Sequence, residues 1–164
     1  MKYKPKPRFH RGFLLDAGAA SGETLVRKLF PQALVMTASS FELLDDVLGD
    51  GFALLAPPGT PPHVLAQIPP GDAKPPIRPV AVLDKEDASA VEPPIVIARD
   101  LPGDLAALLG RHPVGLFLLR PDRYVAAFFP LASAHSAPER IARLVGETWP
   151  PVTSESAARS GGTA

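Results

Sequence analysis

Proline placement constrains the fold of this chain more than any other sequence feature. The 21 prolines gather mainly in clusters at 57–62, 69–79 and 93–94. Because proline fixes φ and lacks an N–H donor, such clusters are typical of extended linkers and strand borders. We therefore expect short regular elements separated by proline-rich connections.

Apolar runs between these clusters predict four short strands, at 32–37, 52–56, 78–83 and 95–98. They are rich in the β-branched and large apolar residues that suit a pleated surface. Pro79 lies inside the third run. It predicts either that this strand is at a sheet edge or that Pro79 is its first residue.

Helix signals occur at three places before residue 111. Ser39-Ser40-Phe41-Glu42 matches a capping box, in which a serine hydroxyl and a glutamate carboxylate satisfy free amides at a helix start. The expected buried face of that helix is Phe41, Leu44, Val47 and Leu48, and Gly49 ends it. Short helices are also expected over 63–68 and over 102–109, the latter with Leu105, Leu108 and Leu109 facing inward and Gly110 at its end.

A hairpin and a final helix complete the expected elements. The apolar runs 114–119 and 124–129 are joined by a tight turn around Pro121-Asp122. We expect Asp122 to fix the turn together with Arg120 in a structural role, and Tyr124 to pack at the sheet edge. The Ser136 to Glu139 segment repeats the capping-box spacing and predicts a helix that buries Ile141, Leu144, Val145 and Trp149.

Composition excludes several classes of function. The 17 basic and 17 acidic residues cancel, so the chain has no global field that would attract nucleic acid or a membrane. There is no cysteine, which removes disulfides, thiolate catalysis and cysteine-ligated metal. No apolar run is long enough for a signal peptide or a membrane span, and the cytoplasm is the expected location.

The basic opening of the chain has two possible interpretations. It consists of Lys2, Lys4, Lys6, Arg8 and Arg11, interleaved with two prolines. Such a segment either grips phosphate or forms an extended, solvated arm, and we favour the arm because the run is short.

Candidate reactive groups are few and poorly spaced. The histidines at positions 10, 63, 112 and 135 show no metal-ligand spacing, so we interpret them as surface histidines. Asp45 and Asp46 are adjacent, and adjacent helix positions point about 100° apart, which prevents their carboxylates from converging on one atom.

Two further motifs fall short of an active site. His135-Ser136 resembles a base and nucleophile, but neighbouring residues rarely reach triad geometry and Ser136 is better used as a helix cap. Gly18 to Gly22 is glycine-rich, yet it lacks the lysine of a P-loop and the GxGxxG of a dinucleotide fold. No catalytic, cofactor-binding or metal residue is therefore predicted.

The order of elements predicts an α/β fold with a central mixed sheet and flanking helices. A terminal hairpin followed by a helix is how a thioredoxin-like domain ends, here without a CxxC motif. We expect an extended segment at 1–30, the thioredoxin-like domain at 31–151, and a small, polar, disordered tail at 152–164.

Three segments resemble the C-terminal region of FAD-dependent aromatic-ring hydroxylases of the 3-(3-hydroxyphenyl)propionate hydroxylase and phenol 2-monooxygenase type. The first is KYKPKPRF at 2–9 followed by LFPQ at 29–32. The second is LLDDVLGDGFALL at 43–55, and the third is LRPDRYVA at 119–126, which is close to the form RPDxYVA. Together they extend over most of residues 1–150.

This resemblance implies a non-catalytic accessory domain that supports oligomerisation and stability. FAD and NAD(P)H are implied for the parent enzymes, with no residues of this chain to bind them. The implied partners are a second copy or a flavin-binding monooxygenase domain. Because a whole enzyme of this family is several times longer, we interpret the chain as a split gene product, a remnant or an expressed fragment.

The alternative function is a stand-alone small-molecule binder of the same fold. In that case the proline-rich loops 57–62 and 69–79 would line a cleft together with His63 and Arg78.

Overall fold

A single mixed sheet organises the computed structural model, which describes residues 25–67, 76–85, 91–110 and 112–148, with side chains described up to residue 143. The strands of this sheet are β1 (Leu34–Met36), β2 (Phe41–Leu43), β3 (Phe52–Ala56), β4 (Ile77–Asp84), β5 (Val96–Asp100), β6 (Gly115–Leu119) and β7 (Val125–Pro130). Their order in space is β2-β1-β5-β4-β3-β6-β7. The strands β3, β4 and β5 are parallel neighbours, and every other pair is antiparallel.

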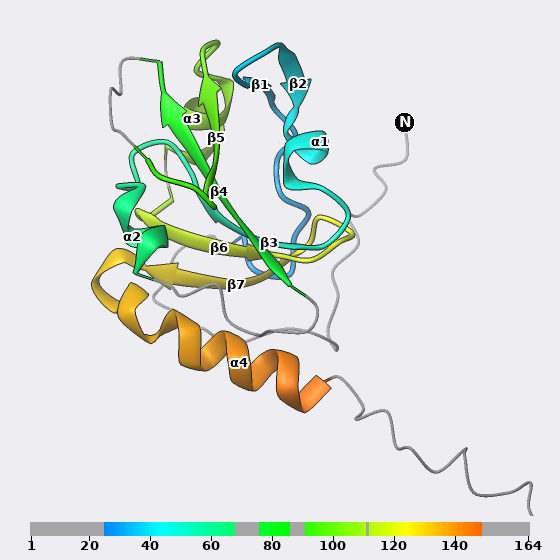
Figure 1. Ribbon diagram of the computed structural model, residues 1–164, viewed down its shortest axis with the longest axis vertical. Helices are drawn as coiled ribbons and strands as arrows, with labels where there is room; N and C mark the ends of the chain where they lie inside the picture. Colours follow the sequence, from blue (N-terminus) through cyan, green and yellow to red (C-terminus); the bar gives the residue numbers. More distant parts are fainter. Residues whose placement is uncertain (1–24, 68–75, 86–90, 111, 149–164) are drawn as a thin grey trace, which may run out of the picture.

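Helices cover both faces of this sheet (Figure 1). On one face, α2 (His63–Ala66), the 3-10 helix η1 (Leu131–Ser136) and α4 (Ala137–Thr148) pack over β3, β4, β6 and β7. On the other face lie α1 (Leu44–Leu48), α3 (Asp104–Leu109) and the segment that leads into β1. The predicted α/β, thioredoxin-like class with a central mixed sheet and flanking helices is confirmed.

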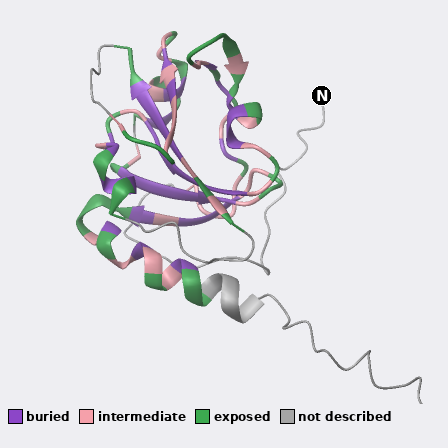
Figure 2. Ribbon diagram, viewed as in Figure 1, coloured by how far each residue is buried: buried purple, intermediate pink, exposed green. Residues whose placement is uncertain are grey.

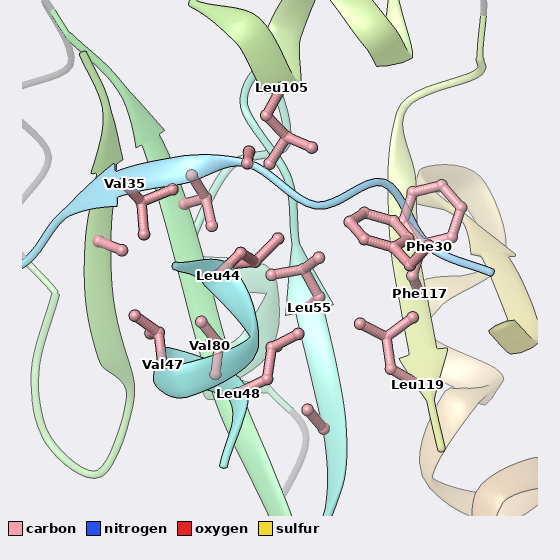
Figure 3. Close-up of a cluster of buried hydrophobic side chains, with 14 of the residues drawn as sticks. Phe30, Val35, Leu44, Val47, Leu48, Leu55, Val80, Leu105, Phe117 and Leu119 are labelled. Atoms are coloured by element: carbon pink, nitrogen blue, oxygen red, sulfur yellow. The ribbon is translucent and has the colours of Figure 1, made fainter. Parts of the chain in front are cut away.

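The central strand β3 is buried along its whole length. Phe52, Leu54 and Ala56 point to the α4 face, whereas Ala53 and Leu55 point to the α1 face. A strand covered on both faces is a continuous apolar run rather than an alternating one, which is why FALLA is a strand. Figure 3 shows the α1-face cluster, where Leu44 and Leu48 lie beside Leu55, and Phe30 lies against Phe117.

Residues 25–30 pack against the start of β7. Arg27 N donates to Val125 O at 3.0 Å, and Phe30 N donates to Arg123 O at 2.9 Å. The Phe30 side chain is 5% exposed and belongs to the α1-face core. The predicted arm at 2–11, the glycine-rich loop at 18–22, His10 and the tail at 152–164 lie outside the described residues.

The helix predicted from Ser39-Ser40-Phe41-Glu42 starts four residues later than expected, and that part of the prediction is wrong. Residues 41–43 form strand β2, which pairs with β1, and α1 begins after Leu43 without a side-chain cap. The capping-box groups close the β1–β2 turn instead, because the hydroxyls of Thr37 and Ser40 donate to Glu42 Oε1 at 2.8 and 3.0 Å. Serine and threonine hydroxyls stabilise turns as readily as helix starts.

Three smaller expectations also need correction. Strand β4 is internal and Pro79 is its third residue, but pairing with β5 begins only at Val80, so Pro79 lies where one edge of the strand is still open. Leu108 is 55% exposed rather than inward-facing, unlike Leu105 and Leu109. Ser136 does not cap α4, because its hydroxyl donates to Ser133 O at 2.8 Å.

Of the other side chains expected to be buried, most are buried, but the expectation for Phe41 is wrong. Leu44, Val47, Leu48 and Ile141 are buried, whereas Phe41 is 51% exposed. The side chains of Leu144 and Val145, and the whole of Trp149, lie outside the described residues.

Candidate functional site

The described histidines stay apart from one another and from acidic clusters. His63 begins α2, His112 lies between α3 and β6, and His135 is in η1. Among the residues that the structure describes, no three histidine or acidic side chains are placed to hold a metal ion.

The paired acidic and paired His-Ser motifs have structural surroundings. Asp45 Oδ1 forms an ion pair with Arg123 Nε at 3.2 Å, whereas the adjacent Asp46 is exposed. The Ser136 hydroxyl donates to Ser133 O, and the neighbouring His135 is exposed. Neither pair converges on a point where a substrate atom could react.

His63 and Arg78 lie at opposite ends of β3. Arg78 pairs with Ala53 near the amino end of that strand, and its guanidinium lies beside Gly49. His63 follows the carboxyl end of the same strand, after Ala56. The structure therefore does not bring these two side chains together in one cleft, and loop residues 68–75 lie outside the described part.

The β6–β7 connection is a three-residue loop of Pro121, Asp122 and Arg123. Arg123 N donates to Arg120 O at 2.9 Å, and Arg120 N donates to Tyr124 O at 3.0 Å. Asp122 bonds both sides of the turn, accepting from Arg120 Nη2 at 2.6 Å and from Tyr124 N at 3.4 Å. The structural role expected for Arg120 and Asp122 matches these contacts.

Arg123 is the residue of this loop that sequence reasoning missed. Its φ is 67°, at the left-handed position that a three-residue hairpin loop requires. Its Nη2 donates to Asp45 O at 2.9 Å and to Gly49 O at 2.7 Å, and Arg123 Nη1 is buried. The guanidinium thus satisfies carbonyl groups at the C-terminal end of α1, where a helix has free acceptors and favours a positive charge.

A second polar contact closes the loop after β3. The Thr60 hydroxyl donates to Gly115 O at 3.0 Å and accepts from Gly115 N at 3.3 Å. Thr60 is 4% exposed, and a Cβ at Gly115 would overlap the Phe129 carbonyl oxygen. This hydroxyl is fully engaged in holding the loop to β6.

The most exposed apolar surface with a regular geometry is on the β1–β2 ribbon. In its antiparallel register Leu34 is opposite Leu43 and Met36 is opposite Phe41, so these four side chains share one face. Leu34, Leu43 and Phe41 are 43%, 46% and 51% exposed, and Met36 is partly exposed. We call this set the ribbon face. Figure 2 shows the exposed ribbon well away from α4.

The described residues thus define a thioredoxin-like domain whose polar groups hold loops together and whose ribbon face is available for contact with another surface. The chain belongs to the HcaD C-terminal domain family, whose model matches residues 28–144. The resemblance to the C-terminal domain of FAD-dependent aromatic hydroxylases is confirmed.

Curated relatives support the same assignment. The chain is 34% identical over 155 residues to the 3-(3-hydroxy-phenyl)propionate/3-hydroxycinnamic acid hydroxylase of Mycolicibacterium smegmatis. The aligned region covers 89% of this chain and 26% of that protein. The equally named protein of Mycobacterium avium is 31% identical over 151 residues, with 88% and 25% covered. The chain therefore spans about a quarter of the length of these relatives.

Solved structures confirm the fold. The flavin-dependent monooxygenase PieE matches with a TM-score of 0.57 at 21% identity, covering 87% of this chain and 25% of that one. Yeast Sco1 matches at 0.56 with 12% identity, covering 74% and 97%. A putative thiol:disulfide interchange protein DsbE from Chlorobium tepidum matches at 0.51 with 18% identity, covering 72% and 96%. No helix among the described residues is long and apolar enough to cross a membrane.

Proposed function

We propose that this chain is a non-catalytic accessory domain of an FAD- and NAD(P)H-dependent aromatic-ring monooxygenase, acting through protein contact in oligomerisation and stability. The family match over residues 28–144 carries this proposal. The proposed domain is 31–151, joined by the packed residues 25–30, and its proposed location is the cytoplasm.

The described residues of this chain do not fit FAD or a nicotinamide cofactor. A dinucleotide phosphate is normally held by backbone N–H groups where a strand turns into a helix. In the β3–α2 loop, Pro57, Pro58, Pro61 and Pro62 have no N–H to donate, and the Thr60 hydroxyl is already engaged. At the start of α3, Asp100 Oδ2 accepts from Ala106 N at 2.8 Å, so a side chain of the protein already occupies that end.

FAD and NAD(P)H are therefore proposed for the remainder of the parent enzyme, and the flavin chemistry is supplied there. The residues of this chain would then contribute to protein contact and not to proton or electron transfer. Thr60 and Arg123 hold the loops at the two ends of β3.

Association with a flavoprotein fragment tests this function. The M. smegmatis hydroxylase, expressed without the region that this chain matches and loaded with FAD, is mixed with the purified chain, and sedimentation velocity gives the masses present. We expect a complex of the two proteins. An ordinary weak protein contact has a Kd of about 1 μM. If the FAD-loaded fragment and the chain sediment separately at about 100 μM, which is 100-fold above that Kd, the proposal is wrong.

A further inference from the structure

We propose that the ribbon face, Leu34, Met36, Phe41 and Leu43, is the surface that docks on the flavin-binding portion of the monooxygenase. This inference rests on the proposed function and names the part of the domain that performs it. The partner that fits is an apolar patch on the larger, FAD-containing part of the protein.

The geometry of the ribbon favours docking over burial within the domain. Val35, between Leu34 and Met36, points to the opposite side of the sheet and is fully buried in the α1-face core. The ribbon face is thus on the α4 side of the sheet, but α4 and α2 pack over other strands and leave it uncovered. In the part of the chain that the structure describes, no helix covers this extension of a sheet face that is covered elsewhere.

A charged residue borders the ribbon face on its β5 side. Arg99 of β5 pairs directly with Met36 and therefore lies on the same face, and its Nη1 donates to Asp84 O at 3.4 Å. The turn hydroxyls of Thr37 and Ser40 are bonded to Glu42, which is opposite Val35 in the register and therefore lies on the other face of the ribbon. The ribbon face itself is therefore apolar, as the centre of a protein contact usually is.

The size of the ribbon face argues for a partner joined to, or assembled with, this domain rather than a second copy. If an aromatic side chain buries roughly 150–250 Å² in full, three half-exposed large side chains present on the order of 250–300 Å². A stable dimer needs about 800 Å² on each partner. Contacts between domains of one protein can be smaller, about 600–1,500 Å² in total, which is also the range of transient contacts between separate chains.

The length of the relatives points to the same occupant. This chain matches only 26% of the M. smegmatis hydroxylase and 25% of PieE. Three-quarters of each such protein therefore lies outside the region described by this fold, and that remainder provides a surface for the ribbon face to meet.

Matched surface variants test the assignment. The ribbon variant is Phe41→Ser with Leu43→Ser, and the control variant is Leu108→Ser with Leu131→Ser, which changes two leucines of similar exposure, 55% and 39%, on α3 and η1. Each is titrated into the FAD-loaded M. smegmatis fragment, and circular dichroism confirms that each variant is folded. We expect the ribbon variant to raise the Kd at least about tenfold, as truncation of central anchors does, and the control to stay within about twofold.

The outcomes separate the two proposals. If the wild-type chain binds and the ribbon variant binds equally well, the ribbon assignment is wrong and the accessory function stands. If the wild-type chain does not bind, the accessory function fails first. If the wild-type chain alone sediments as a dimer that the ribbon variant abolishes, the occupant is a second copy and the assignment is also overturned.

A fused form provides the same comparison where the fragment does not retain FAD. The wild-type chain, the ribbon variant and the control variant are each fused in place of the matched region of the full-length hydroxylase. The rate at which a protease releases the domain from each fusion is then measured. Faster release of the ribbon variant alone supports docking through the ribbon face, and equal rates for all three contradict it.

Discussion

At the scale of single residues, Arg123 shows how one side chain offsets an unfavourable backbone conformation. A non-glycine residue with a φ of 67° costs roughly 1–2 kcal/mol. The guanidinium of Arg123 compensates by bonding Asp45 and Gly49, which are more than 70 positions earlier in the chain. Arg123 thereby ties the hairpin loop to the C-terminal end of α1.

Substitution of Arg123 separates these two contributions. Arg123→Ala removes the side-chain bonds but keeps the strained φ, and should lower the free energy of unfolding by about 2–3 kcal/mol. Arg123→Gly removes the strain as well and should cost about 1 kcal/mol less. Urea denaturation of the two variants measures the difference. Equal stabilities for alanine and glycine would mean that the left-handed φ is not costly here.

Thr60 provides a second residue-scale prediction. Thr60→Val keeps the side-chain shape but leaves the buried N–H and C=O of Gly115 without the hydroxyl, which should cost about 1–3 kcal/mol. Thr60→Ser retains the hydroxyl and should cost clearly less. Thermal unfolding of both variants is the measurement, and a valine variant as stable as the serine variant would contradict the role given to this hydroxyl.

At the scale of elements, β3 and β2 contribute in opposite ways. Every residue of β3 is buried, and it pairs with β4 on one side and β6 on the other. Strand β2 is at the end of the sheet, pairs with no described strand other than β1, and exposes its two large apolar side chains. Stability should therefore depend on β3, whereas contact with other proteins should depend on β2.

A pair of core and surface substitutions tests this division. Leu55→Ala in β3 leaves a cavity in the α1-face core and should lower the free energy of unfolding by about 2–5 kcal/mol. Phe41→Ser in β2 should change it by less than about 0.5 kcal/mol, because surface substitutions away from special contacts rarely do more. Comparable losses for the two variants in guanidinium denaturation would show that β2 is part of the core.

The same contrast explains what could be predicted from the sequence. Strand β3 and the β6–β7 hairpin are specified locally, by the run FALLA and by two apolar runs around Pro121-Asp122. The start of α1 was misassigned because Ser-Ser-Phe-Glu satisfies both a capping box and a β1–β2 turn. Pairing with β1, a contact beyond local propensity, determines that residues 41–43 form a strand.

The candidate surfaces were less predictable for a related reason. No local pattern shows that the Arg123 guanidinium reaches Gly49, 74 positions earlier in the sequence. The ribbon face becomes visible only when the register places Leu34 opposite Leu43 and the packing of α4 elsewhere leaves both exposed. Its periodicity is that of any half-buried strand, so the sequence cannot distinguish a core face from a docking face.

At the scale of the whole molecule, the described residues form one thioredoxin-like sheet, whereas the activity proposed for the parent enzyme belongs to a longer protein. The thioredoxin-like sheet has both faces packed with helices, and its two best-defined polar contacts hold loops. The ribbon face extends from this sheet, and the family relatives are about four times as long as the region they share with the chain. We infer that the domain supplies contact and stability, and that redox chemistry belongs to its partner.

The most direct test of this account is a thermal-shift comparison between the chain and its proposed partner. The Tm of the FAD-loaded M. smegmatis fragment is measured with increasing amounts of this chain, and the Tm of the chain alone is measured with FAD, NADPH and phenolic acids. A species that binds only the folded state raises Tm with concentration. The account predicts that the chain raises the Tm of the fragment and that no small ligand raises the Tm of the chain. Stabilisation of the chain by FAD, NADPH or a phenolic acid, with no effect on the fragment, would contradict it and identify a small-molecule binder instead.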